Sequence, residues 1–469
     1  MKGRFAMKPT KLFSIVFSLV TVLGLLAGCA TPKPPAANAP TQAPAVEAAP
    51  TEAAAEAPAQ AATGKVTELA YWTFVAQHID FMQKRVATWN EQHPDEQIKL
   101  VPTNIPWAQI HDNLLIAMQA GEGVPDIADI EIGRWPVFMR GDVQLLDLTK
   151  YIDPYRADLV TNRLDIYSKD GKNYGADSHI GATVMYYNTE LLDQAGIDYK
   201  IIKTWDDFES AMKTYKEKTG KYMTYCETWG AYQFTVLLAQ QGKDLVDDQG
   251  MPQLNTPEAL KAIERIRGWA DEDICAFIPS GNADTDEGKA AVANGEVAAL
   301  MYPLWYMSRF TDNMANLSGK VAIAPLPVWD ENSYKSLGLG GTGTTVYKNS
   351  PYADLAARFI TWAKFSEEGS ALLWTDLGND PINKKVAQNL EVTRDPGNKF
   401  LQYFETNPFD VLAQVQDKMF TVKTMQNSGT INDYLSNTTW NRILVNKEDP
   451  ATVMKETQAE MESQALPPQ

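Results

Sequence analysis

Residues 66–127 decide the fold, and they read VTELAYWTFVAQHIDFMQKRVATWNEQHPDEQIKLVPTNIPWAQIHDNLLIAMQAGEGVPDI. Strand-like and helix-like segments alternate along this stretch: strand 69–74, helix 80–93, strand 97–101, helix 107–120 and strand 124–127. Pro94 ends the first helix because proline cannot continue it. This β-α-β-α-β order predicts an α/β protein with a mainly parallel sheet covered by helices. Sheets of this kind bind ligands beyond the carboxyl ends of their strands.

A second block of strands and helices follows from residue 183. It comprises strands at 183–187, 297–301 and 321–324 and helices at 205–218, 256–270, 351–365 and 367–374. Thr204 or Asp206 is available to cap the helix that begins at Trp205. Because this block repeats the alternation of the first, we expect a second sheet of the same kind. Two lobes joined by strands suit hinge closure on a ligand.

The first 28 residues predict a signal peptide. Its positive charges come from Lys2, Arg4, Lys8 and Lys11. Residues 12–27 are apolar apart from a few Ser, Thr and Gly, a run that suits an exported leader better than a membrane span of about 20 apolar residues. The segment LLAGC at 25–29 resembles the bacterial lipobox, in which the cysteine is acylated and the leader is cut before it. We therefore expect Cys29 to carry a lipid outside the cytoplasmic membrane, in a periplasm or on the outer cell surface; the alternative is an ordinary anchor helix.

Residues 29–64 predict a disordered tether behind the lipidated cysteine. They are mostly Ala, Pro, Thr, Glu and Gln, with Val46 as the one large apolar side chain, so they cannot bury a core. The prolines keep such a chain extended at about 3 Å per residue, which gives a reach on the order of 100 Å. Residues 65–469 are too many for one hydrophobic core and enough for two lobes.

Charge and residue usage disfavour several classes of partner. The net charge is −17, and loss of the four positive charges of the leader brings the mature chain near −21, which argues against nucleic acid. Cys226 and Cys275 remain as an even pair, either a disulfide or two buried free thiols. We expect no cofactor and no zinc site, because no metal-ligand spacing joins the cysteines to the four histidines, His78, His93, His111 and His179.

The order of segments after the tether resembles a known family. The matching pieces are GVPDI (123–127), GDVQLLDLTKYID (141–153), NYGADSHIGATVMYYNTELLDQAGI (173–197), TWDDFESAMK (204–213), EGKAAVANGEVAALMYPLWY (287–306), APLPVW (324–329), LGGTGTTVYKNS (339–350), AARFITWAKFSEEGSALL (356–373) and GNDPINKKV (378–386). Together they resemble the extracellular solute-binding proteins of bacterial ABC importers, in the carbohydrate-binding family that includes maltose-binding protein. No single piece is specific, but their order and spacing are.

The resemblance implies a two-lobed periplasmic-binding-protein type II fold with a hinge and an interlobe ligand cleft. It places residues 65–178 plus about 328–378 in lobe 1, and about 179–327 plus 379–469 in lobe 2. It also implies a monomeric substrate-binding lipoprotein that captures a sugar or oligosaccharide and delivers it to the permease subunits of an ABC importer. The sequence departs from maltose-binding protein at many presumed contacts, so maltose itself is not carried over.

Aromatic side chains are the first candidates for a sugar site, because sugars present flat C–H faces beside their hydroxyls. Trp305 matches the family position at which an aromatic ring stacks on the sugar, and its alternative place is the core of the lobe. Tyr306 is its neighbour and ranks lower. Trp229 and Tyr232 lie in a loop before an apolar helix, where the family also places aromatic contacts. Phe74 ends the first strand and is expected to line the same cleft.

Polar candidates follow the third predicted strand and the first. Glu131, Arg134 and Trp135 lie in the loop after residues 124–127, which is expected to face the cleft. Glu131 is interpreted as a hydroxyl acceptor, with a solvated surface carboxylate as the alternative. Gln77 is a further contact candidate near Phe74.

The predicted crossovers between the lobes carry the remaining candidates. Asp177 and His179 lie at the first crossover, although a single histidine is more often structural. Asp380 lies at the later crossover, where it either accepts from a sugar hydroxyl or caps the turn before Pro381. Gly341 belongs to a glycine-rich loop that lets backbone approach a ligand or another strand closely, or is simply flexible.

Functions other than sugar capture are alternatives for this sequence. The same fold could bind a non-sugar solute such as a glycerol-phosphodiester, a polyamine or a metal complex, or serve a sensory receptor. A surface glycosidase would need two working carboxylates, and no motif selects such a pair. The chain has no GxSxG, HExxH or P-loop motif, so we expect no enzyme.

Overall fold

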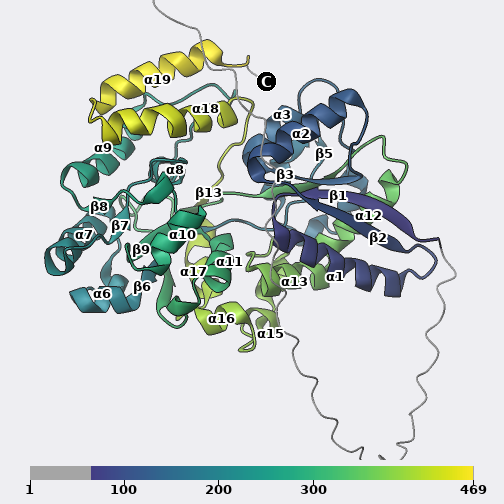
Figure 1. Ribbon diagram of the computed structural model, residues 1–469, viewed down its shortest axis with the longest axis horizontal. Coiled ribbons are helices and arrows are strands. Elements are labelled where there is room, and N and C mark those ends of the chain that lie inside the picture. The colour runs from purple at the N-terminus through teal and green to yellow at the C-terminus, as the bar shows by residue number, and fades with distance from the viewer. Residues whose placement is uncertain (1–64, 468–469) are drawn as a thin grey trace, which may run out of the picture. The chain divides into compact units, whose positions relative to one another are not determined.

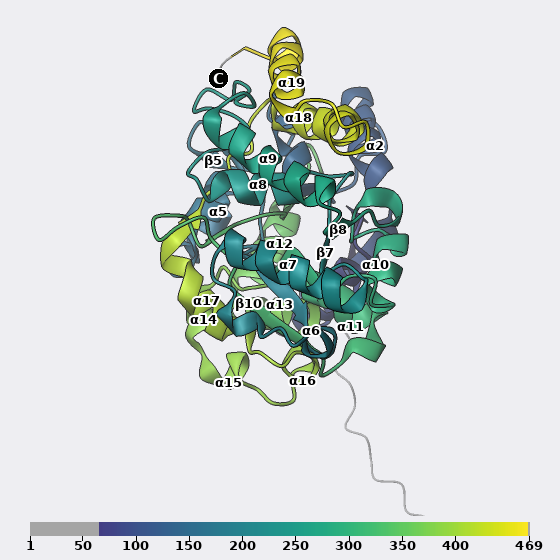
Figure 2. The same ribbon diagram turned by 90° about the vertical axis from the view of Figure 1, so that its left-hand side faces the viewer.

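The computed structural model describes residues 65–467 of the chain (Figures 1 and 2). The predicted signal peptide, the lipid attachment at Cys29 and the tether to residue 64 lie outside the described residues. None of the described helices is both long and apolar enough to cross a membrane.

The first sheet has four strands in the order β12-β3-β1-β2. Their bounds are β1 Thr67–Thr73, β2 Ile98–Asn104, β3 Ile127–Glu131 and β12 Thr342–Val346. β1 runs parallel to β2 and β3, as predicted, whereas β12 returns antiparallel to β3 and sets Thr342 opposite Glu131. The strand expected at 124–127 lies later in the chain, from Ile127 to Glu131. The buried residues continue to Ile130, and Asp126, just before the strand, accepts the Ala70 N–H with its carboxylate.

Helices cover both faces of this sheet. One face packs against α1, α12 and α13 and the other against α2 and α3 (Figure 1). Their bounds are α1 Ala76–Gln92, α2 Trp107–Ala120, α3 Trp135–Phe138, α12 Ala353–Phe365 and α13 Glu367–Leu377. The sheet ends that carry Thr73, Glu131 and Thr342 therefore stay uncovered by these helices and are available to a site.

The second sheet has the order β10-β6-β9, with β6 Thr183–Asn188, β9 Ala299–Pro303 and β10 Val321–Ala324. Both pairings are antiparallel, so the expectation of a second mainly parallel sheet is wrong. β6 enters directly from the crossover, and the long excursion after it returns β9 from the opposite end, so Pro303 lies opposite Thr183. Parallel pairing in this lobe is confined, among the named strands, to the short strands β7 Thr224–Tyr225 with β8 Cys275–Ala276 and β11 with β13.

Most of the remaining helices surround the second sheet. They are α6 Thr189–Ala195, α7 Trp205–Thr219, α8 Tyr232–Ala239, α9 Pro257–Asp271, α10 Asp286–Ala293, α11 Met307–Asn313, α14 Lys384–Gln388, α15 Leu390–Thr393, α16 Lys399–Tyr403, α17 Pro408–Val415, α18 Ser428–Tyr434 and α19 Pro450–Gln464. The short elements left are α4 Thr149–Ile152, α5 Thr161–Asp165, β4 Ser168–Lys169, β5 Lys172–Asn173, β11 Ser336–Leu337 and β13 Met419–Phe420. Thr204, rather than Asp206, caps α7, and Asp207 completes a reciprocal capping box with it.

Two sets of buried residues form the cores. The first draws on residues between 69 and 176 and between 346 and 382, and the second on residues between 182 and 339 and between 374 and 461. Leu337 and Leu339 belong to the second set, and β11 pairs with β13 there, although residues 328–339 were expected in lobe 1. We therefore propose that the chain returns to lobe 1 near residue 340.

Three chain segments run side by side where the cores meet. The carboxylate of Asp380 accepts hydrogen bonds from the N–H groups of Gly181 at 3.0 Å and Ala182 at 2.9 Å, and Leu339 donates its N–H to the Gly181 carbonyl at 2.9 Å. Burial raises the pKa of Asp380 to about 6, against the lowering effect of these backbone donors. This carboxylate therefore ties two crossing segments together.

Candidate ligand-binding cleft

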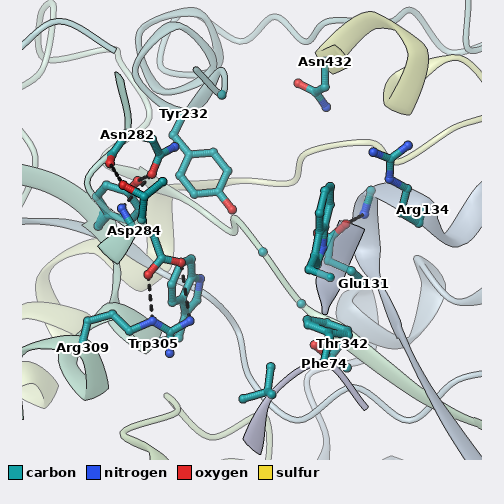
Figure 3. A pocket seen from close by; sticks show the side chains of 18 of the residues that line it. Phe74, Glu131, Arg134, Tyr232, Asn282, Asp284, Trp305, Arg309, Thr342 and Asn432 are labelled. Carbon is teal, nitrogen blue, oxygen red and sulfur yellow. Dashed lines mark hydrogen bonds and ion pairs between the residues drawn. The ribbon is translucent and has the colours of Figure 1, made fainter. Parts of the chain in front are cut away.

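A cavity of about 540 Å³ lies between the two sheets, lined by residues of both lobes. Its volume falls in the range of sites for small molecules, roughly 300–1,000 Å³. Figure 3 shows Tyr232 and Trp305 on one side of the cavity and Phe74, Glu131 and Arg134 on the opposite side. The two sides are held in place by different means.

Trp305 is fixed by the crossing segment. It lies in a 3-10 turn directly after β9, and its indole N–H donates to the Leu339 carbonyl at 3.1 Å. Gly340 adopts φ +71°, and a Cβ there would lie 2.7 Å from the indole nitrogen, so glycine is required for this approach. Because its polar atom is satisfied by backbone, the ring can offer a face to a ligand.

Arg309 and Asp284 form an ion pair beside Trp305 (Figure 3). Arg309 Nε lies 2.8 Å from Asp284 Oδ1, and the guanidinium carbon lies 5.1 Å from the centre of the Trp305 ring. Both charged residues belong to the second lobe: Arg309 lies on α11, and Asp284 lies in the turn that precedes α10. The positive charge at this side of the cavity is thereby neutralised from within one lobe.

The base of the loop that carries Trp229 is held by a disulfide and by hydrogen bonds. Cys226 and Cys275 form a disulfide next to the pairing of β7 with β8, which settles the choice that the sequence left open. The side-chain amide of Asn282 donates to the Trp229 carbonyl at 2.9 Å and to Glu227 at 3.3 Å. Burial raises the pKa of Glu227 to about 8. Trp229 itself is 47% exposed, so the ring projects from a loop whose base is rigid.

Glu131 ends β3 and faces the cavity from the first lobe. Its carboxylate accepts the Gly133 N–H at 2.9 Å, and its own N–H donates to Nε2 of His111 at 3.0 Å. Burial raises the pKa of Glu131 to about 7, opposed by the Gly133 hydrogen bond and the charge of Arg134. Burial lowers the pKa of His111 to about 4, so its ring is neutral near pH 7 and can accept this hydrogen bond.

Arg134 joins the two lobes at the edge of the cavity. Its guanidinium makes two hydrogen bonds to the Asp433 carboxylate on α18, at 3.1 and 3.2 Å. The same guanidinium lies 4.9 Å from the centre of the Trp107 ring at the start of α2. Gly429 on α18 also approaches Gly133, where a Cβ would lie 3.1 Å from the carbonyl oxygen. This edge of the cleft is therefore in contact across the lobes.

The family model for bacterial extracellular solute-binding proteins matches residues 76–369. The chain belongs to this family. The arabinooligosaccharide-binding protein of Halalkalibacterium halodurans is 39% identical over 399 residues, which cover 85% of this chain and 89% of that protein. The arabinooligosaccharide-binding protein of Bacillus subtilis is 40% identical over 356 residues, covering 75% and 82%. As an extracellular solute-binding protein, the chain functions outside the cytoplasmic membrane.

Solved structures of sugar-binding proteins share the fold of this solute-binding protein. A binding protein of Bifidobacterium animalis subsp. lactis in complex with β-1,6-galactobiose superposes with a TM-score of 0.70 at 21% identity, covering 85% of this chain and 97% of that one. The galacto-N-biose/lacto-N-biose I-binding protein of Bifidobacterium longum gives 0.69 at 21% identity, covering 84% and 96%. The predicted two-lobed type II fold is thereby confirmed.

Most of the residues predicted for the site line the cavity of the solute-binding protein. They are Phe74, Gln77, Glu131, Arg134, His179, Trp229, Tyr232, Trp305 and Gly341. Gly341 lies against the Arg163 guanidinium, where a Cβ would approach to 2.5 Å, so its smallness serves packing as well as the lining. That these residues touch a ligand stays a prediction.

Four other candidates do not line the cavity. Asp177 is fully buried with its carboxylate 2.6 Å from Arg163, and Asp380 holds the crossing segments. Tyr306 is buried, and its hydroxyl donates to the Ala283 carbonyl at 2.6 Å. Trp135 packs in the core of the first lobe, 4.8 Å from the Tyr167 ring. Direct ligand contact by these four side chains is not supported by this geometry.

Several lining residues escaped the sequence analysis. They include His78, Trp107, Asn282, Asp284, Arg309, Thr342, Asn432 and Asp433. Arg309 could have been predicted from the sequence. It follows Trp305 by four residues, a spacing that puts both side chains on one helical face. No local sequence pattern indicates Asp433, because its partner Arg134 lies 299 residues away in the sequence.

The arrangement suits binding of a polar ligand with apolar faces. Both lobes supply aromatic rings, hydrogen-bonding side chains lie between them, and the two arginines of the lining are each paired with a carboxylate. Within residues 65–467, no group of three or more His, Cys, Asp or Glu side chains is arranged to hold a metal ion.

Proposed function

We propose that this solute-binding protein captures a neutral oligosaccharide, of the arabino-oligosaccharide class, between its lobes and delivers it to an ABC importer. The observation that carries the proposal is the composition of the cavity wall. Both lobes contribute aromatic rings to the lining, Phe74 and Trp107 from the first and Trp229, Tyr232 and Trp305 from the second, together with side chains that give and accept hydrogen bonds. Such a wall matches the C–H faces and hydroxyl rim of a sugar.

The sugar class is supported by the relatives. Two proteins named as arabinooligosaccharide-binding are 39% and 40% identical to this chain over most of its length. Identity at that level is well above that of the solved sugar-binding proteins, which stands near 20%. We therefore place the ligand with arabinose oligomers rather than with malto-oligosaccharides.

The charges of the cavity support a neutral ligand. Arg134 and Arg309 are both engaged by carboxylates, and Glu131 adds a further carboxyl. An anionic sugar would have to displace Asp433 or Asp284 and lie near Glu131. The paired arginines therefore favour a ligand without a carboxylate or phosphate.

Transport would use the two-lobed architecture. Binding shifts an open–closed equilibrium when a ligand contacts both lobes only in the closed arrangement. We expect a monomer that releases its ligand to permease subunits and does not hydrolyse it. We also propose that acylated Cys29 anchors the chain to the membrane and that residues 30–64 serve as its tether; both lie outside the described residues.

Calorimetry and thermal shift with a ligand panel test the proposal. The panel contains arabino-oligosaccharides, malto-oligosaccharides, galacturonate oligomers, a glycerol-phosphodiester and spermidine. We expect saturable binding of an arabino-oligosaccharide with a dissociation constant on the order of micromolar, about −8 kcal/mol. A response confined to the phosphodiester or to spermidine would contradict the ligand class. Release of reducing ends during incubation would contradict a pure binding role.

Mass spectrometry of the full-length protein made in a bacterial cell tests the anchor. We expect a diacylglyceryl or triacyl modification on a chain that begins at Cys29, and partition into detergent. The variant Cys29→Ser should remain unacylated and partition into water. An unmodified wild-type chain that keeps its leader would contradict the proposed anchor.

A further inference from the structure

His78 lines the cavity and is held by a carboxylate beneath it. It lies in the first turn of α1, and its Nδ1 is 2.8 Å from Oδ2 of Asp129. The His78 side chain is 16% exposed, whereas that of Asp129 is fully buried. The ring therefore turns one edge to the interior of lobe 1 and keeps the other edge toward the cavity.

Asp129 lies at the centre of β3 and accepts hydrogen bonds from several neighbours. The Tyr71 hydroxyl donates to it at 2.6 Å and the Thr73 hydroxyl at 2.7 Å, and Thr344 on β12 donates as well. Four side chains, His78 included, thus converge on one carboxylate from two strands and a helix. A side chain held by this many partners has one orientation only.

The carboxylate is ionised in the folded protein. Burial alone would raise the pKa of Asp129, but the hydrogen bond and charge of His78 outweigh it, with help from the charge of Lys364 and the Thr344 hydrogen bond. The pKa of Asp129 consequently lies below its ordinary value. An ionised carboxylate only accepts, so the ring hydrogen of a neutral His78 resides on Nδ1.

The opposite edge of the His78 ring carries the second nitrogen, Nε2. Nδ1 is engaged by Asp129, and Nε2 has no hydrogen-bond partner among residues 65–467. His179 also lines the cavity, and its Nδ1 is buried without a partner in the same part of the chain. Both imidazoles thus have a nitrogen that no protein group satisfies.

We propose that His78 is a ligand-binding residue whose Nε2 forms a hydrogen bond with a sugar hydroxyl, with Asp129 as its positioning residue. This inference rests on the proposed sugar-binding function and names a group that receives the ligand in lobe 1. The carboxylate fixes which ring nitrogen faces the cavity before the ligand arrives. The ligand then meets a ring nitrogen that needs no reorientation, which lowers the ordering cost of binding.

Two substitutions test the roles of the two ring nitrogens of His78 separately. Asparagine in His78→Asn places its amide where Nδ1 lies and has no atom at the position of Nε2. Glutamine in His78→Gln reaches the position of Nε2 with an amide oxygen. We expect H78N to weaken binding of an arabino-oligosaccharide about 10-fold, the cost of a lost hydrogen bond, and H78Q to stay within about 3-fold of wild type.

The matched control is His93→Asn, which changes the same residue type on the same lobe away from the cavity, where the ring lies 4.1 Å from that of Trp89. Calorimetry of the full mature chain with arabinotriose and its monodeoxy analogues completes the test. We expect one deoxy analogue to bind wild-type protein less tightly and to lose nothing further in H78N. That non-additivity identifies a direct contact, which a merely structural role would not produce.

The ring hydrogen is observable directly. The chain has four histidines, so ¹⁵N-labelled histidine gives few signals, and H78N assigns the one from residue 78. We expect the neutral ring of His78 to carry its hydrogen on Nδ1. In Asp129→Asn the amide can donate to Nδ1, and the hydrogen should move to Nε2; should D129N fail to fold, H78N and H78Q still decide the proposal.

The outcomes separate this inference from the function on which it rests. If wild-type protein binds no arabino-oligosaccharide, the proposed function fails and this inference with it. If wild type binds and H78N binds within about 2-fold of it, only the role of His78 is overturned. A loss in H78N that couples to no hydroxyl of the ligand would likewise overturn a direct contact.

Discussion

Two groups of the same three residue types lie at opposite sides of the cleft. We call Trp305, Arg309 and Asp284 the inner trio and Trp107, Arg134 and Asp433 the bridging trio. In each, an arginine lies about 5 Å from a tryptophan ring and pairs with an aspartate. The inner trio belongs to lobe 2 alone, whereas the bridging trio takes Trp107 and Arg134 from lobe 1 and Asp433 from α18 of lobe 2.

The difference separates a preformed surface from a contact that depends on closure. Asp284 and Arg309 belong to the same lobe and are 29% and 24% exposed, so their pairing does not depend on closure of the lobes. Asp433 is 51% exposed and Arg134 32%, and an exposed ion pair contributes little free energy. The same three residue types therefore form a preformed binding surface in the inner trio and a weak contact between the lobes in the bridging trio.

The largest effect should come from Trp305→Ala. Loss of a ring that stacks on the ligand removes the main contact of the inner trio, and truncation of such central aromatics costs about 2–4 kcal/mol. We expect affinity to fall about 100-fold with the melting temperature of the ligand-free protein nearly unchanged, measured by calorimetry and thermal shift.

Trp329→Ala is the control for Trp305, because Trp329 lies in the same lobe and does not line the cavity. A large loss of ligand-free stability in W305A with affinity retained would place Trp305 in the core rather than in the site. Trp305→Phe should recover part of the affinity, since a smaller ring still offers a face.

Asp284→Asn should have the second-largest effect. It leaves the Arg309 guanidinium partly buried without a charge partner, and we expect about 10-fold weaker binding of the neutral sugar. The freed guanidinium should also give the variant an affinity for galacturonate oligomers that wild type lacks. Calorimetry with both ligands measures this, and the exposed Asp286→Asn is the control. A variant that keeps full affinity would show that the inner trio is not part of the site.

Glu131, beside the bridging trio, predicts a pH dependence. Its pKa is raised by burial from an ordinary 4.5 to about 7, so the folded chain binds more protons than the unfolded chain between these values. The free energy of unfolding therefore contains a contribution that is lost as the pH rises through this window. Glu131→Gln removes the contribution, and E131Q should be more stable than wild type at pH 8.5 by about 3 kcal/mol and nearly equal to it near pH 4.5.

Chemical denaturation of the ligand-free protein at several pH values measures this effect. The control is Glu217→Gln on α7, an exposed glutamate whose replacement should leave the pH profile of wild type unchanged. A parallel profile for E131Q and wild type would contradict the raised pKa, because it would show that folding does not change the pKa of Glu131.

The smallest effect should come from Asp433→Asn. It breaks the ion pair between the lobes, and we expect about 3-fold weaker binding with unchanged ligand-free melting. The loss should shrink at high salt, because exposed charges are screened. If D433N costs as much affinity as D284N, the two trios act alike and the distinction drawn between them is wrong.

Local signals allowed much of the fold to be predicted from sequence. The bounds of α2, Trp107–Ala120, were predicted at both ends, where Pro106 precedes the helix and Gly121 adopts φ +70° after it. The direction of β9 could not be predicted, because the pattern of residues within a strand is the same for parallel and antiparallel pairing.

The site was predictable where contacts are local and not where they are distant. Trp305 and Tyr306 are adjacent aromatic residues, yet one lines the cavity and the other is buried, because the chain turns as a 3-10 helix there. Asp177 was expected to contact the ligand at a crossover, but it is buried against Arg163, which neutralises it inside the lobe. Asp433 has no sequence pattern that ties it to Arg134, since only the folded chain brings α18 to that edge.

The disulfide between Cys226 and Cys275 has a consequence for any preparation of the protein. It lies at the base of the loop that carries Trp229, and a chain produced in a reducing cytosol would contain the two thiols instead. Such a sample would mix molecules with a fixed and a loosened loop, and a sugar titration would report fewer than one competent site per molecule. Production with export, or refolding under oxidising conditions, should restore a stoichiometry of one.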